Sequence, residues 1–101
     1  MASSTATVDY ILEQIADAGA VRARKMFGEY GVYCDDTFIG VICDDTFFVK
    51  PTPQGTALAP GLDMSPAYDG AKPSLKITAD LLEDADRLSQ LVRVTASALA
   101  A

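Results

Sequence analysis

The sequence predicts an α+β fold in which helices cover a mainly antiparallel sheet, and three observations predict it. An amphipathic segment opens the chain and another ends it. Between them, the pentapeptide Cys-Asp-Asp-Thr-Phe occurs twice, at 34–38 and 43–47. Each Asp-Asp pair separates two apolar runs, which is typical of a tight turn between two strands. The predicted order is helix, three strands, short helix, one or two strands, helix.

Composition narrows the classes of function. The 101 residues are the size of one domain, spanning 1–101, with residues 1–4 and about 98–101 expected to fray. A net charge of −6 disfavours general binding to phosphate backbones and to anionic membranes, so nucleic acid and membrane partners are not expected. The apolar start of the chain carries Asp9, Glu13 and Asp17 and no basic leader. We therefore expect a cytoplasmic protein without a signal peptide.

The first helix is predicted from a stripe of apolar residues at helical spacing. Thr5 or Thr7 can cap its start, and Gly19 suits its end. The stripe is most simply a core face, and a partner-binding helix is the alternative. It comprises Val8, Ile11, Leu12 and Ile15.

The segment 21–25 is the most basic part of the chain, with Arg22, Arg24 and Lys25. The simpler interpretation is a solvated linker after the first helix. The alternative is a small anion site, an acidic-partner site or a DNA contact, although three charges are few for a nucleic-acid groove.

The stretch 25–50 is predicted to be a three-stranded meander. If each Asp-Asp is a two-residue loop, Cys34 pairs with Thr37 and Val32 with Ile39 in the first hairpin. A four-residue loop is the alternative, because Asp-Asp lacks the glycine that tight turns favour. In the two-residue register both faces of the sheet are apolar. One face collects Tyr30, Val32, Cys34, Ile39, Val41 and Phe48, and the other Tyr33, Phe38, Ile42, Phe47 and Val49.

Two apolar faces are unusual for an antiparallel sheet with one side in water. Either helices or a partner cover both sides, or the register differs by one residue. An uncovered apolar face that pairs with itself would indicate a homodimer. In the same register Cys34 and Cys43 lie at opposite ends of the middle strand, about 20 Å apart at about 3.3 Å per residue. No disulfide is expected, because a bridge needs Cα atoms within about 7 Å.

The second half of the chain predicts a short helix, one or two strands and a final helix. Gln54–Ala59 reads as the short helix, and 62–67 as irregular. Ser74–Thr78 alternates as a strand does, after a turn at Asp69-Gly70. Thr78 or Asp80 begins the last helix, and Asp80 with Glu83 resembles a capping box. Its apolar stripe comprises Leu81, Ala85, Leu88, Val92, Ala96 and Leu99.

The residue types present disfavour catalysis. The chain has no histidine, which removes the usual general base and most transition-metal sites. Two adjacent aspartates at a sharp turn supply too few oxygens for calcium. We expect no catalytic residues, no metal and no cofactor. Three tyrosines and two lysines could converge at one end of the sheet: Tyr30, Tyr33, Tyr68, Lys50 and Lys72.

Lys25-Met26-Phe27-Gly28-Glu29-Tyr30-Gly31-Val32-Tyr33 resembles the signature of the TfoX N-terminal domain family, named for bacterial competence regulators. Lys50-Pro51-Thr52, the segment 66–73 and Asp80–Asp84 match further family segments in the same order. The resemblance covers about 8–99. It implies a secretion-chaperone-like order of helix, three strands, helix, two strands, helix.

The resemblance also implies a kind of function. Competence regulators of this family are thought to act with a transcription regulator, the cyclic-AMP receptor protein, and the larger ones carry a second domain that these 101 residues do not include. The family offers no catalytic residues to transfer. We expect a small regulatory module with a protein partner, with direct DNA binding or a small-ligand or enzymatic role as alternatives. The matched positions proposed to contact a partner are Lys25, Glu29, Tyr30, Tyr33, Lys50, Tyr68 and Lys72.

Overall fold

The computed structural model describes residues 2–100 and confirms the α+β fold class. A six-stranded, wholly antiparallel sheet has the order β1-β2-β3-β4-β6-β5. The strands are β1 (Val21–Met26), β2 (Glu29–Cys34), β3 (Thr37–Cys43), β4 (Thr46–Val49), β5 (Met64–Pro66) and β6 (Pro73–Lys76). The helices are α1 (Thr5–Gln14), the 3-10 turn η1 (Ala16–Ala18), α2 (Pro53–Leu58), α3 (Ala79–Glu83) and α4 (Ala85–Ala100).

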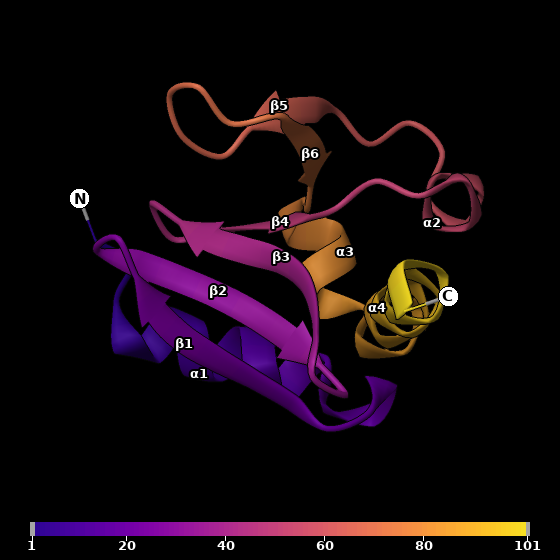
Figure 1. The fold of residues 1–101 in the computed structure, drawn as a ribbon. Helices are drawn as coiled ribbons and strands as arrows, with labels where there is room; N and C mark the ends of the chain where they lie inside the picture. Colours follow the sequence, from indigo (N-terminus) through magenta and orange to yellow (C-terminus); the bar gives the residue numbers. More distant parts are fainter. Residues whose placement is uncertain (1, 101) are drawn as a thin grey trace.

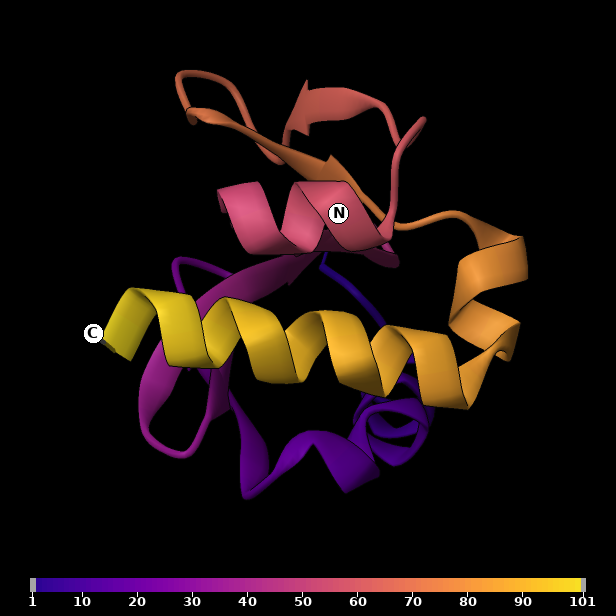
Figure 2. The same ribbon diagram turned by 90° about the vertical axis from the view of Figure 1, so that its right-hand side faces the viewer.

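Helices cover one face of the sheet (Figure 1). Turning the molecule by 90° shows α4 lying lengthwise with α2 beside it (Figure 2). The core between helices and sheet contains Val8 and Ile11 of α1 and Ile15 directly after it, so the predicted core stripe is confirmed. In α4 the buried residues include Leu88, Val92 and Ala96. Within residues 2–100, no helix has the length and apolar character needed to cross a bilayer.

The predicted linker 21–25 is instead strand β1, so the meander has four strands and not three. Phe27 and Gly28 form the missing turn, with φ of +52° and +80°. Two positive φ angles in succession are what a two-residue hairpin turn requires, and Phe-Gly supplies glycine at its second position. The basic side chains of this segment therefore lie on an edge strand.

Both Asp-Asp pairs form two-residue turns, as predicted. All four aspartates have positive φ, between +50° and +66°. Cys34 pairs with Thr37 and Cys43 with Thr46 across these turns. The two cysteines are free and buried, and the register places them beside turns at opposite ends of β3.

The predicted assignment of side chains to the two faces of the sheet is wrong, because β3 contains a β-bulge. Tyr33 pairs with Phe38, but Val32 pairs with Gly40, so Ile39 is an extra residue on its strand. The extra residue reverses the alternation of side chains along the rest of β3. Ile42, Phe47 and Val49 thereby join Val32, Cys34 and Ile39 in the core.

Several other expectations at the ends of elements differ from the structure. Ser4, and not Thr5 or Thr7, caps α1, and Ser3 is only 5 % exposed although residues 1–4 were expected to fray. Thr78 caps α3, because its hydroxyl accepts from the backbone N–H of Leu81. The predicted capping box of Asp80 and Glu83 is therefore not the start of this helix. Helix α4 extends to Ala100, and a break at Asp84 separates it from α3. The predicted fraying of residues 1 and 101 lies outside the described residues.

Candidate functional site

The face of the sheet away from the helices carries a groove lined with apolar residues, which we call the open-face groove. Its larger part is a cavity of about 530 Å³, lined by Met26, Phe27, Glu29, Tyr30, Phe38, Val41, Cys43 and Tyr68. Its smaller part, about 230 Å³, shares Phe38, Val41 and Tyr68 and adds Lys50 and Lys72. All of these residues come from strands and from the segments that connect them.

The floor of the groove follows from the bulge in β3. Val41 pairs with Gly31 on one side and with Phe48 on the other. Phe38 pairs with Tyr33, and their rings are 5.4 Å apart. Cys43 and Phe48 are buried but lie outside the main core cluster. The open face is therefore apolar in its own right, without belonging to the helix-covered core.

Two exposed aromatic side chains flank the larger cavity. Phe27 is 100 % exposed at the tip of the β1–β2 turn, and Tyr68 is 63 % exposed in the loop between β5 and β6. In Figure 1 this turn, the β3–β4 turn and the β5–β6 loop all lie at the same end of the sheet. A fully exposed phenylalanine buries no apolar surface when the chain folds, and this one lies beside an apolar cavity.

The smaller part of the groove is basic. Lys50 and Lys72 line it, and the Lys50 ammonium lies 5.1 Å from the centroid of the Phe38 ring. That distance is within the range of a cation–π contact, so the aliphatic stem of Lys50 extends over the apolar floor. The groove thus has an apolar end at Phe27 and a positively charged end at the two lysines.

The carboxylate in the groove, Glu29, is already engaged. Its Oε1 accepts from the backbone N–H of Ser3 and its Oε2 from that of Asp44, both at 2.8 Å. Partial burial raises the pKa of Glu29, but these two hydrogen bonds outweigh that effect and hold it below its usual 4.5. Glu29 is therefore a charged structural group with both oxygens occupied.

The cysteine in the groove is a poor nucleophile. Burial, then the nearby carboxylates of Glu29 and Asp44, raise the pKa of the Cys43 thiol above its usual 9.0. A thiol that resists deprotonation reacts slowly as a nucleophile and as a metal ligand. Within residues 2–100, no group of three or more acidic or sulfur-bearing residues is placed to hold a metal.

The structure brings together some of the residues that the sequence singled out. Glu29, Tyr30, Tyr68, Lys50 and Lys72 all line the groove. Tyr33 lies beside it, against Phe38. Lys25 and Arg24 do not line it and extend from β1, where the backbone register sets them opposite Tyr30 and Gly31.

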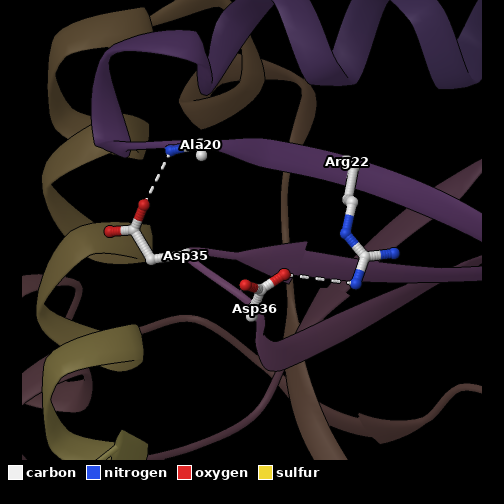
Figure 3. Close-up of polar contacts among 4 residues, drawn as sticks. All are labelled: Ala20, Arg22, Asp35 and Asp36. Carbon is white, nitrogen blue, oxygen red and sulfur yellow. Dashed lines mark hydrogen bonds and ion pairs between the residues drawn. The ribbon is translucent and has the colours of Figure 1, made fainter.

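Arg22 is the basic residue of β1 with visible partners. Its guanidinium lies 3.4 Å from Oδ1 of Asp36 (Figure 3). It also lies 4.6 Å from the centroid of the Tyr33 ring. The two charged side chains are 48 % and 88 % exposed, so this ion pair contributes little to stability. Figure 3 also shows Asp35 accepting a 2.9 Å hydrogen bond from the backbone N–H of Ala20.

Sequence reasoning missed five of the residues that line the larger cavity. They are Met26, Phe27, Phe38, Val41 and Cys43. The sequence did contain a signal for Phe27. If Phe27-Gly28 is interpreted as a turn, the Phe27 ring lies at the tip of a hairpin, where it cannot be buried in the core.

The sequence matches a known protein family over most of its length. The sequence model of the TfoX N-terminal domain matches residues 13–99. The chain belongs to the TfoX N-terminal domain family. It is also 35 % identical over 101 residues to an uncharacterised 12.7 kDa protein in the trpE 5′ region of Spirochaeta aurantia. That alignment covers all of this chain and 87 % of the relative.

The structure shows which elements the family's signature segment, residues 25–33, forms. Lys25 to Tyr33 forms the end of β1, the Phe27-Gly28 turn and most of β2. The same nine residues supply Met26, Phe27, Glu29 and Tyr30 to the larger cavity. The family resemblance and the open-face groove therefore converge on one hairpin.

Proposed function

We propose that this TfoX N-terminal domain is a small regulatory module that works by binding a protein partner on its open sheet face. The observation that carries the proposal is the pairing of an apolar cavity of about 530 Å³ with the fully exposed ring of Phe27. Such cavities are large enough to receive one or two side chains of a partner. Exposed aromatic residues beside a cavity are the usual anchors of protein interfaces.

The proposed role is binding and not catalysis. The groove contains one carboxylate, whose oxygens both accept backbone hydrogen bonds, and one thiol with a raised pKa. The sequence has no histidine to act as a base near pH 7. A link to competence or to transcription is part of the proposal and rests on the family alone.

The variant Phe27→Asn tests the proposal because it separates binding from folding. Asn-Gly is the favoured sequence for a turn with two positive φ angles, so removing the ring should stabilise the hairpin by about 0.5–1 kcal/mol. The tagged chain is used to capture proteins from the host, which are quantified by mass spectrometry. The amount of the partner captured by Phe27→Asn should be about tenfold lower than the amount captured by the wild type. Tyr68→Ser should weaken the same capture without loss of fold.

The matched control is Tyr10→Asn, which removes an exposed ring from α1. It should leave the captured proteins unchanged. The unfolding midpoints of both variants should remain at or above that of the wild type. If Phe27→Asn and Tyr68→Ser then captured a partner as well as the wild type does, the proposed binding face would be contradicted.

A further inference from the structure

The open face of the sheet carries most of the basic residues. Five of the eight lie along it: Arg22, Arg24, Lys50, Lys72 and Lys76. Arg22 and Arg24 pair with Tyr33 and Gly31 in the register that also places Val41 on this face. Lys76 pairs with Phe48, the neighbour of Val41. The same face has acidic groups as well, because Glu29 lines the larger cavity and Asp36 pairs with Arg22.

The helices carry most of the net negative charge. Carboxylates extend along α1, η1, α3 and the start of α4: Asp9, Glu13, Asp17, Asp80, Glu83, Asp84 and Asp86. The strands, turns and loops contain seven acidic and six basic residues, so they are close to neutral. The smaller part of the groove is lined by Lys50 and Lys72 and by no carboxylate of residues 2–100, so a partner that approaches it meets a local positive charge.

We infer that the occupant of the open-face groove is an acidic amphipathic peptide segment of a partner protein. In this arrangement a large apolar side chain enters the cavity between Phe27 and Tyr68, and carboxylates next to it meet Lys50 and Lys72. The inference rests on the proposed function and adds the chemistry of the partner. Charge complementarity at the rim sets orientation and association rate, and the apolar anchor supplies most of the affinity.

The shape of the groove favours a peptide over a polynucleotide. Met26, Val41 and Cys43 line the larger cavity, which offers mainly apolar side-chain surface and, among the described residues, no lysine or arginine to meet a phosphate. The rings of Tyr33 and Phe38 already hold cations, Arg22 and Lys50, at 4.6 and 5.1 Å. Bases that stack on aromatic platforms need free ring faces.

The test begins with selection from a display library of random peptides of about ten residues, enough to cross the groove at about 3.3 Å per residue. The full chain is the bait. Enriched peptides should combine Asp or Glu with Leu, Phe or Trp. Enrichment of basic or uncharged peptides, or no enrichment above an uncoated surface, overturns the inference.

Charge reversal then locates the binding site. Fluorescence anisotropy of the best peptide, labelled with fluorescein, should show Lys50→Glu and Lys72→Glu each weakening binding about fivefold or more, with a further loss as salt rises. Arg87→Glu, on α4, makes the same change in net charge away from the groove and should alter affinity less than twofold. Equal effects of the three variants overturn the inference.

Two further measurements distinguish the competing occupants. A labelled single-stranded thymidine oligonucleotide should bind about tenfold more weakly than the peptide at equal salt; equal or tighter binding would favour a nucleic acid. Sedimentation equilibrium should show a monomer, and a dimer abolished by Lys50→Glu would make a second copy the occupant. If peptides fail while host-protein capture still depends on Phe27, the proposed function stands and only the peptide chemistry is wrong.

Discussion

At the scale of single residues, the doubled Asp-Asp pairs do more than reverse the chain. Aspartate tolerates the left-handed backbone better than most residues, which explains why these turns form without glycine. In the first turn Asp35 accepts from Ala20, and in the second Asp45 accepts from the backbone N–H of Ser4 at 2.8 Å. Identical pentapeptides thus use different members of the pair to fix a neighbouring segment.

Replacing the two aspartates of the first turn separates these roles. Asp35→Gly keeps a backbone suited to positive φ but removes the hydrogen bond to Ala20, so the free energy of unfolding should fall by about 1 kcal/mol. Asp36→Gly removes only the exposed ion pair with Arg22 and should change stability by less than about 0.5 kcal/mol. Urea unfolding of the two variants checks this, and equal losses would show that Asp35 acts through the turn alone.

At the scale of elements, the bulge in β3 decides what the two faces of the sheet contain. Gly40 makes the bulge feasible because its backbone lies against β4. A Cβ added there would clash with the backbone carbonyl oxygen of Phe48. Gly31 lies on the same pair of strands, but a Cβ there would meet the sulfur of Met26 at 2.6 Å, at the flexible end of a side chain.

Alanine substitution should therefore have unequal effects at the two glycines. Gly40→Ala must displace backbone and should lower the free energy of unfolding by about 3 kcal/mol or more. Gly31→Ala requires that the flexible Met26 side chain adopt another rotamer and that the Phe38 ring shift slightly, and about 1 kcal/mol is expected. Chemical denaturation provides the comparison. Similar losses at both positions would mean that β4 does not approach β3 as closely as the structure places it.

At this scale, some features of the sheet could be predicted from the sequence and others could not. The repeated Cys-Asp-Asp-Thr-Phe sequences predicted both Asp-Asp turns and the pairing beside them, because turn chemistry is local. The bulge was not predictable, since Ile39 suits either face of a strand and only packing against the helices selects one. Strand β1 was not predicted because its basic residues are as typical of a solvated linker as of an exposed edge strand.

At the scale of the whole molecule, the candidate site combines what sequence could and could not predict. The family signature indicated the correct hairpin, and Tyr68, Lys50 and Lys72 do meet across segments distant in sequence. A net charge of −6 gave no indication that Lys50 and Lys72 line one part of the groove together. Which charged residues share a site depends on the register of the strands and on the segments that connect them.

The N-terminal segment is tied to the sheet by a cluster of hydrogen bonds around Glu29. Ser3 and Asp44 donate backbone N–H groups to its carboxylate, while Asp45 donates its N–H to Oγ of Ser3 at 2.9 Å. The cluster thereby joins the start of the chain, the β1–β2 hairpin and the β3–β4 turn. Its strength depends on Glu29 being ionised, because only the carboxylate accepts through both oxygens.

This cluster predicts a specific sensitivity to acid. Because the pKa of Glu29 is lower in the folded state than its usual 4.5, its contribution to stability is complete above that pH and is lost as pH falls through the folded pKa. Glu29→Gln should cost about 1 kcal/mol at pH 7, and the variant should lose less further stability than the wild type between about pH 5 and 3. Urea unfolding across this range measures both effects. Glu13→Gln, at an exposed position of α1, is the matched control and should retain the pH profile of the wild type. If Glu29→Gln also retained the wild-type profile, the cluster would not hold the N-terminal segment in place.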